Sequence, residues 1–252
     1  MRVGGIVDIS TKDIPNRSTM VIFTVGCNLS CEFCHNKYLL HEGVGREIDV
    51  PKLMEQIKSN MLVSSVSISG GEPTLQKELL ELCKEIKKLG KYISIDTNGT
   101  NSKSITELLP FINRVALDIK GPLNNKRLTK ITGNPVNLNS IIETFRAVNN
   151  RENIDFEIRT TYVGNLMKSN DIDKIILFLR KNQFRGIFVL QQYQYSEGVG
   201  EENKLKFKKP EHFTLLNILK PYKNMDFSFQ IYLRDDVIGY SKIDKLYEYL
   251  DA

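Results

Sequence analysis

The sequence contains no tryptophan, only four cysteines and only three histidines among its 252 residues. So few cysteines exclude a fold held together by disulfide bonds, because small disulfide-bonded domains contain cysteine at a much higher density. No apolar run approaches the roughly 18 residues of a membrane-spanning helix, and the first residues, MRVGGIVDIS, lack the charged-then-apolar pattern of a signal peptide. These absences favour a reduced, cytoplasmic protein without a membrane partner.

Charge is also modest, with a formal net charge of +5. A small excess of this kind does not favour nucleic acid as a partner. Hydrophobic residues make up 41% and charged residues 26%, which is ordinary for a globular protein. The densest basic stretch is KLKFKK at 204–209. Such short runs are usually solvated loops, although the wider polar segment 196–210 also has the composition of a docking loop.

Apolar periodicity alternates along the chain between the periods of strands and of helices. Alternation of this kind predicts βαβ units, hence an α/β fold with a parallel sheet. No linker separates the elements, so residues 1–252 are expected to form a single domain. The expected strands are 20–25, 63–69, 92–96, 114–119, 156–162, 186–193 and 227–233, and the expected helices are 49–61, 74–89, 102–109, 139–149, 171–182, 210–220 and 241–250.

The predicted strands carry one apolar and one polar face, because successive strand residues point to opposite sides. In VALD at 115–118, for example, Val115 and Leu117 oppose Ala116 and Asp118. A closed TIM barrel fills its interior with branched apolar side chains. A polar inner face instead predicts an open, partial (β/α)6 barrel that holds a polar ligand. The alternative is an ordinary sheet whose polar face meets solvent.

Three of the four cysteines, Cys27, Cys31 and Cys34, lie within eight positions and have the spacing C-x3-C-x2-C. A structural zinc site needs a fourth ligand, which His41 or Cys83 would have to supply without motif spacing. A [4Fe–4S] cluster normally takes a cysteine on each of its four irons. Three cysteines leave one iron open to bind a small molecule through amino and carboxylate groups. Cys83 has helical spacing with apolar neighbours and is interpreted as a core residue.

The cysteine motif, with an aromatic residue before its last cysteine, resembles that of the radical S-adenosylmethionine (SAM) superfamily. Further stretches extend the resemblance to the activating enzymes of glycyl radical enzymes, including those of pyruvate formate-lyase and of anaerobic ribonucleotide reductase. These stretches are CHN (34–36), SISGGEPTL (67–75), DTNG (96–99), LDIKG (117–121) and the opening VGGIVDIS (3–10). The resemblance implies a partial (β/α)6 barrel with extra N- and C-terminal elements. It also implies reductive cleavage of SAM to a 5′-deoxyadenosyl radical.

The same resemblance implies roles for individual residues. Cys27, Cys31 and Cys34 would bind the [4Fe–4S] cluster. Glu72 would accept a hydrogen bond from the SAM ammonium, and Gly70 and Gly71 would allow the close backbone approach that a Cβ forbids. Asp96 and Asp118 would hold a ribose, an ammonium or a monovalent cation beside SAM. The remaining residues expected at the SAM site are Phe33, Asn98, Lys120 and Arg159.

The implied partners are a glycyl radical enzyme as protein substrate and a flavodoxin or ferredoxin as electron donor. Two departures from the activase pattern stand out. No second cysteine cluster follows the motif, and Gln-Tyr-Gln at 192–194 replaces the Pro-Tyr-His of the pyruvate formate-lyase activase. The alternative is a radical SAM enzyme for a small molecule, such as a relative of 7-carboxy-7-deazaguanine synthase. That family usually has an acidic residue where His35 stands.

Overall fold

The structure is a computed structural model and describes residues 1–41, 43–195 and 201–250. The chain forms two compact units. The first comprises residues 1–30, 36–117 and 137–156, and the second comprises residues 31–35, 118–136 and the described residues from 157 onward. The boundary therefore assigns Cys27 to the first unit and Cys31 and Cys34 to the second. The expectation of a single domain over 1–252 stays a prediction.

The first unit is built on a sheet with the strand order β6-β5-β4-β2-β1-β3. In this sheet β2, β4, β5 and β6 run parallel, whereas β1 and β3 are antiparallel additions. The parallel core brings the carboxyl ends of four strands to one edge. The strands are β1 (Arg2–Ser10), β2 (Thr19–Thr24), β3 (Arg46–Glu47), β4 (Ser65–Gly70), β5 (Tyr92–Thr97) and β6 (Arg114–Asp118).

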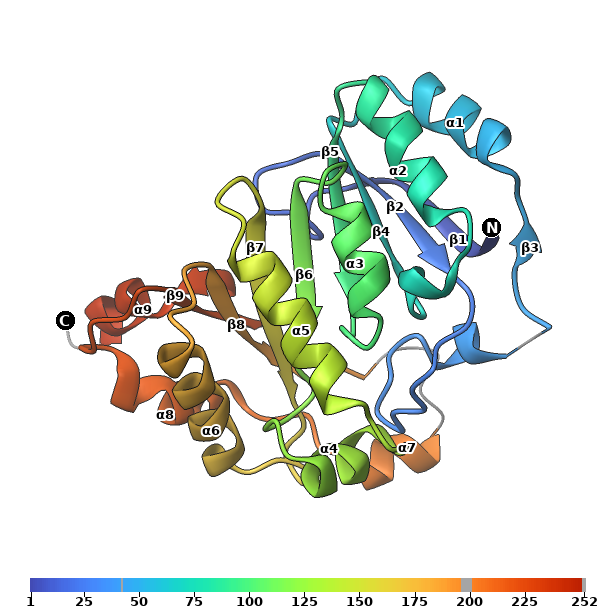
Figure 1. Cartoon of the computed structure of the whole chain (residues 1–252). Helices are drawn as coiled ribbons and strands as arrows, with labels where there is room; N and C mark the ends of the chain where they lie inside the picture. The colour runs from blue at the N-terminus through green and yellow to red at the C-terminus, as the bar shows by residue number, and fades with distance from the viewer. Residues whose placement is uncertain (42, 196–200, 251–252) are drawn as a thin grey trace. The chain divides into compact units, whose positions relative to one another are not determined.

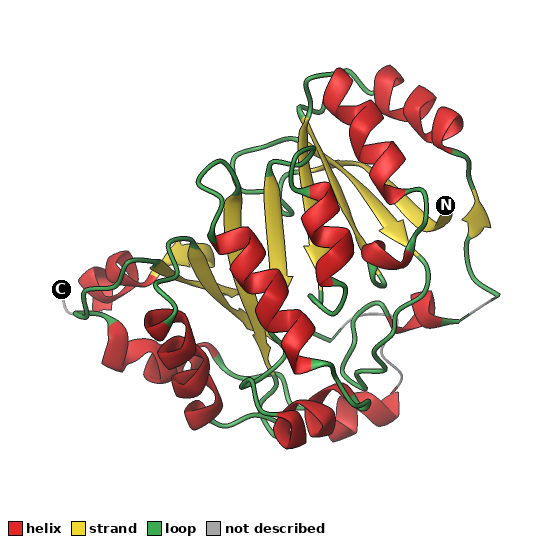
Figure 2. Ribbon diagram, in the orientation of Figure 1, coloured by secondary structure: helices red, strands yellow, loops and turns green. Residues whose placement is uncertain are grey.

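The helices of the first unit cover one face of its sheet, where α2, α3 and α5 lie over the strands (Figures 1 and 2). α1 packs against α2, and α3 packs against α5. Asp49 caps α1 by accepting a hydrogen bond from the Lys52 amide at 2.8 Å. The elements are α1 (Val50–Ser59), α2 (Leu79–Lys88), α3 (Ser102–Leu108), α5 (Leu138–Asn149) and the 3-10 turns η1 (Lys37–Leu40) and η2 (Pro73–Leu75).

Both faces of the first unit's central strands are buried. The apolar side chains Val66, Ile68, Ile93 and Ile95 are fully buried, as predicted. On the polar face Ser94 is also buried, so the alternative of a solvent-facing polar side is wrong for this residue. Buried polar groups need hydrogen-bond partners. Part of this face is therefore a polar interior.

The second unit has a sheet with the strand order β10-β9-β8-β7. β7, β8 and β9 are parallel, and β10 pairs antiparallel with β9. β9, β10 and α9 are the extra C-terminal elements. The elements are β7 (Asp155–Tyr162), β8 (Ile187–Gln192), β9 (Gln230–Asp235), β10 (Gly239–Lys242), α4 (Asn125–Thr132), α6 (Ser169–Lys181), α7 (Glu201–Lys206), α8 (His212–Leu219), η3 (Lys220–Tyr222) and α9 (Ile243–Leu250).

Most predicted elements are present, with differences at their ends. The helix predicted over 74–89 begins only at Leu79, because η2 and an extended Gln76 precede it. The segment 196–210 is not a loop throughout, since α7 forms within it, while residues 196–200 lie outside the described residues. β1, α4 and β10 were not predicted. No helix in the described part of the chain is both long enough and apolar enough to cross a membrane.

Candidate functional site

The Gly-Gly pair joins the end of β4 to the residues just before Cys27. The Gly71 amide donates to the Thr24 carbonyl at 2.9 Å, and the Glu72 amide donates to the Gly26 carbonyl at 2.8 Å. A Cβ on Gly71 would lie 2.0 Å from the Gly26 oxygen. Gly70 has a φ of +107°, which favours glycine. The two glycines thus allow a direct backbone contact that fixes the start of the cysteine motif.

Glu72 lies fully buried behind this contact. One carboxylate oxygen accepts from the Thr74 amide at 3.2 Å, the Thr74 hydroxyl at 2.6 Å and the Thr97 hydroxyl at 2.8 Å. The other accepts from the Asn98 amide at 2.7 Å. Burial raises the pKa of Glu72, and these hydrogen bonds act against the rise. Glu72 therefore ties the end of β4 to the end of β5.

We expect Glu72→Gln to destabilise the protein. The glutamine NH₂ group must face a donor, either the Asn98 amide or the group of donors at the other oxygen. An unsatisfied buried donor costs about 1–3 kcal/mol, and each kcal/mol lowers Tm by about 2–4 °C for a chain of this size. Thermal unfolding without cofactors measures the effect. Glu81→Gln, on the exposed side of α2, is the matched control, and equal Tm values for both variants would contradict the role assigned to Glu72.

Asn98 connects Glu72 to the first cysteine of the motif. Its Nδ2 group donates to the Cys27 sulfur at 3.7 Å and to Asn28 Oδ1 at 2.9 Å. The Leu29 amide donates to the same sulfur at 3.4 Å. The sulfur of Cys27 thus has two N–H donors from its own unit. Hydrogen bonds to sulfur stabilise the thiolate, which is the form that binds a metal.

Asp96 lies on the polar face of β5 and is half-buried. Its Oδ1 atom lies 3.7 Å from Arg114 Nη1, and Arg114 also donates to the Ser94 hydroxyl at 2.7 Å. Arg114, at the start of β6, was missed by the sequence analysis. The available signal was strand alternation, which places it on the same face as Ala116 and Asp118. The guanidinium balances the charge of Asp96 within the first unit.

In the second unit the last part of the cysteine motif, residues 31–34, forms a tight turn. The Cys34 amide donates to the Cys31 carbonyl at 3.0 Å. Between them, the Phe33 ring is buried and makes edge contacts with Tyr193 and Phe207, with ring centroids 6.4 and 6.3 Å apart. Packing on aromatic rings holds the turn in place. Tyr193 and Phe207 were not predicted to take part in it.

The basic stretch 204–209 supports this turn and is only partly solvated. Phe207, in its middle, is the buried ring that contacts Phe33. Lys206 forms an ion pair with Glu32, which lies inside the cysteine motif. Lys209 forms another with Asp236. The interpretation as a simple solvated connector is therefore wrong for Phe207, whereas Leu205, Lys206 and Lys208 are exposed.

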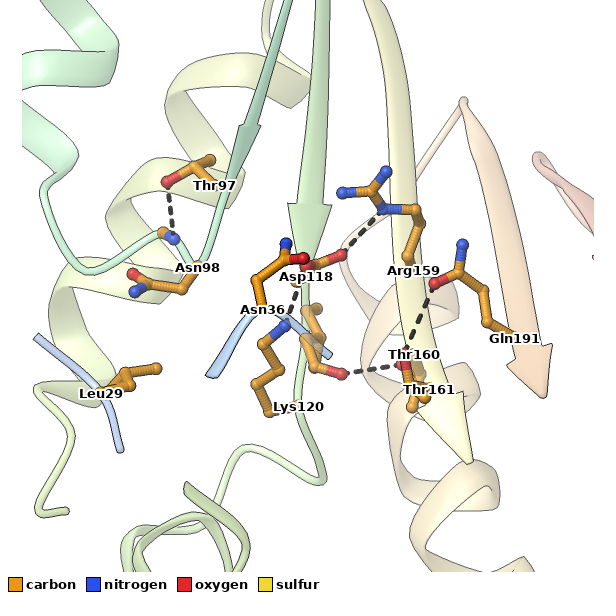
Figure 3. A network of polar contacts seen from close by, with 12 residues as sticks. Leu29, Asn36, Thr97, Asn98, Asp118, Lys120, Arg159, Thr160, Thr161 and Gln191 are labelled. Carbon is orange, nitrogen blue, oxygen red and sulfur yellow. Dashed lines mark hydrogen bonds and ion pairs between the residues drawn. The ribbon is translucent and has the colours of Figure 1, made fainter. Parts of the chain in front are cut away.

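Asp118, Lys120 and Arg159 form a partly buried ionic group in the second unit (Figure 3). Both Lys120 Nζ and Arg159 Nε lie 2.8 Å from the Asp118 carboxylate. Burial acts to raise the pKa of Asp118, but the charges and hydrogen bonds of Arg159 and Lys120 lower it from 3.8 to about 2. For Lys120, burial acts to lower the pKa, but Asp118, Cys31 and Cys34 raise it above its ordinary value. A cation therefore lies beside the second and third cysteines.

The Asp118 group predicts a pH dependence of stability. Its folded-state pKa lies below the unfolded value, so its contribution is present above about pH 4 and is lost as the pH falls towards about 2. We expect the difference in unfolding free energy between the natural chain and Asp118→Asn to stay constant from neutral pH to about pH 5 and to shrink below about pH 4. Urea unfolding at a series of pH values measures it. A difference that does not shrink would show that Asp118 is not the titrating group.

The donor set fits an iron–sulfur cluster. All three motif cysteines are free thiols. Cys27 receives N–H donors, and Cys31 and Cys34 lie beside the Lys120 ammonium. The thiolate is the form in which cysteine binds iron. Cys83 differs, because it is fully buried and burial raises the pKa of its thiol to about 12. The prediction that Cys83 is a core residue is confirmed.

Comparison with known proteins agrees with these residues. The radical SAM superfamily model matches residues 21–181. A Methanocaldococcus jannaschii protein, provisionally named a glycyl-radical enzyme activating enzyme, is 33% identical over 80% of this chain and 84% of its own length. A Pyrococcus horikoshii protein, provisionally named a GTP 3',8-cyclase, is 28% identical over 64% of this chain and 50% of its own length.

The fold agrees as well. The crystal structure of Streptococcus suis SuiB bound to precursor peptide SuiA has a TM-score of 0.66 and 22% identity, covering 91% of this chain and 50% of that chain. This likeness confirms the predicted α/β fold class with a mostly parallel sheet. The family implies a [4Fe–4S] cluster and SAM as cofactors. Family match, cysteine motif and fold together show that this chain belongs to the radical SAM superfamily and is a radical SAM enzyme.

Proposed function

We propose that this enzyme generates a glycyl radical on a partner protein, such as an anaerobic ribonucleotide reductase. The observation that carries the proposal is the similarity to the M. jannaschii protein, which extends over most of both chains. The partner would present a glycine whose Cα–H bond is broken. A flavodoxin or a ferredoxin would supply the electron.

In this proposal Cys27, Cys31 and Cys34 hold the cluster. The cluster and SAM, when bound, supply the chemistry, which is reductive cleavage of SAM to methionine and a 5′-deoxyadenosyl radical. The chain's own residues bind, orient and shield the cofactors. We assign SAM contacts to the bare backbone at Gly70 and Gly71, to Phe33, and to the charged groups Asp96, Asp118, Lys120 and Arg159.

For Glu72 and Asn98 we propose a role different from the SAM contact that the resemblance implies. Glu72 is fully buried and already accepts four hydrogen bonds, and the Asn98 side chain already bonds Cys27 and Asn28. We propose that both residues support the SAM site rather than contact the SAM ammonium. The monovalent cation near Asp96 and Asp118 stays a prediction. Each of these carboxylates already has a cationic side chain near it in its own unit.

The test incubates the reduced, cluster-loaded enzyme with SAM and a candidate partner encoded in the same genome. Electron paramagnetic resonance is expected to show a glycyl doublet. The doublet should be absent with Cys34→Ala, and with a partner whose radical-site glycine is alanine. Formation of 5′-deoxyadenosine and methionine without any glycyl signal would contradict the activase proposal while leaving the radical SAM class intact.

The second candidate is a small-molecule substrate, which is favoured by the similarity to the protein named a GTP 3',8-cyclase. Such an enzyme would consume SAM only when its small substrate is present. Incubation with GTP, and separately with a deazaguanine precursor, distinguishes this candidate. Faster 5′-deoxyadenosine formation with one of these compounds, and none with the protein partner, would replace the activase proposal.

A further inference from the structure

The sulfur of Cys27 has a built hydrogen-bonding environment within the first unit. Two N–H groups donate to it, the Leu29 amide at 3.4 Å and Asn98 Nδ2 at 3.7 Å. The Leu29 amide belongs to the cysteine motif itself. Asn98 comes from the chain after β5, 71 positions away. A donor from so distant a residue must be held in position by other contacts.

Hydrogen bonds to its backbone and to its side-chain oxygen hold Asn98 in position. The Asn98 backbone amide donates to Glu72 at 2.7 Å, which fixes the main chain. The side-chain Oδ1 accepts from the Thr100 amide at 3.0 Å and from the Thr100 hydroxyl at 2.6 Å. These contacts fix the orientation of the side-chain amide. Its Oδ1 must face the Thr100 donors, and its NH₂ group must face Cys27 and Asn28. Figure 3 shows Asn98 where the chain leaves β5.

Hydrogen bonds to cluster sulfurs are one of the means by which a protein sets the potential of its cluster. A donor withdraws electron density from the sulfur, so it favours the reduced cluster, which carries one more negative charge. We infer that Asn98 is a positioning residue that raises the reduction potential of the cluster through Cys27, and that Glu72 holds it in place. The inference rests on cluster binding by Cys27 and is independent of the substrate.

The experiment is an anaerobic redox titration of the reconstituted protein, without SAM or partner. One electron passes from a low-potential chemical reductant to the oxidised cluster, and the reduced cluster is counted by electron paramagnetic resonance. Asn98→Leu removes the donor at similar volume. We expect it to disfavour reduction about tenfold, which is 59 mV for one electron. Asn98→Gln keeps an amide donor and should restore part of the shift.

Asn101→Ser is the matched control, because serine can still cap α3 and adds no charge. Asn101 follows on the same loop and caps α3 through Oδ1, while its Nδ2 donates to the Thr74 carbonyl at 2.9 Å and not to a cysteine. Its replacement should leave the potential unchanged. An Asn98→Leu potential equal to that of the natural chain would overturn the inference, as would equal shifts in Asn98→Leu and Asn101→Ser.

If Asn98→Leu loses the cluster, the comparison uses Asn98→Gln and Asn98→Ala, which differ in the donor but not in charge. A lower potential for Asn98→Ala than for Asn98→Gln supports the inference. If no Asn98 variant holds iron while Asn101→Ser does, Asn98 is needed for cluster assembly and the proposed role in setting the potential is wrong. A natural chain that reduces normally but yields no glycyl radical would refute only the activase proposal.

Discussion

Replacing Cys27, Cys31 or Cys34 with alanine is expected to abolish the cluster, because these three cysteines are all the protein ligands that we propose for it. Iron should fall from about four per chain to near zero after anaerobic reconstitution. SAM cleavage should disappear with it. Iron analysis and the visible absorption of the cluster measure the loss, and 5′-deoxyadenosine formation measures the activity.

Cys83→Ala is the control for these three variants. Cys83 lies in the buried apolar face of α2 and has a thiol pKa raised to about 12, so it offers no thiolate. Its replacement should cost about 1 kcal/mol of stability, as is typical for a point mutation, and leave the iron content unchanged. An iron-free Cys83→Ala variant, together with one motif cysteine that can be replaced without loss, would reverse the ligand assignment.

Gly71→Ala is expected to have the second-largest effect. The new Cβ would lie 2.0 Å from the Gly26 oxygen, which is backbone and cannot move aside like a flexible side chain. Relief requires separating 70–72 from 24–26, which breaks the two backbone hydrogen bonds between these segments. Overpacking costs about 1–3 kcal/mol, and each lost hydrogen bond costs about 1 kcal/mol. A loss of about 3 kcal/mol lowers Tm by roughly 6–12 °C.

Iron content should fall together with stability, since Gly26 directly precedes Cys27. Gly5→Ala provides the matched comparison, because a Cβ on Gly5 meets no atom within 4 Å. Thermal unfolding and iron analysis of the two variants are compared side by side. Comparable Tm values and iron contents would show that the Gly-Gly backbone contact does not position the cysteine motif.

Elements with strong periodicity were predictable from the sequence. Alternation of apolar and polar residues located β4, β5 and β6 to within two residues at each end, because each strand buries both faces with side chains of different character. The cysteine and Gly-Gly motifs were predictable because their chemistry depends on local spacing. These strands and motifs can be recognised from residues that are close together in the sequence.

α4 shows where such prediction fails. Its sequence, NKRLTKIT, is mostly polar, and its buried residues are only Leu128, Ile131 and Thr132. Periodicity over so short a segment is weak. The available signals were Asn124, which caps the helix, and Gly133, which ends it with a positive φ. A short polar helix is therefore found from its caps rather than from its apolar face.

Two of the four donors to Glu72 could not be predicted from the sequence. Thr97 and Asn98 lie 25 and 26 positions later, at the end of another strand. A glutamate after two glycines has the same sequence pattern whether it meets a ligand or its own backbone. Thr74 supplies two donors locally, but only the arrangement of β4 beside β5 brings Thr97 and Asn98 to this carboxylate. Hydrogen bonds between distant segments belong to the tertiary structure and leave no local pattern.

The contact of Phe207 with Phe33 makes the segment after β8 a reporter for the cysteine motif. Lys206 pairs with Glu32 across 174 positions of sequence. The Lys208 amide donates to Asn165 and the Lys209 amide donates to the Tyr195 hydroxyl, so this segment is also anchored to its own unit. Coupling free energies are reciprocal. If iron binding orders the cysteine motif, hydrogen exchange at the amides of Lys208 and Lys209 must become slower. A molecule that binds to residues 204–209 and stabilises them must in return raise the affinity for iron.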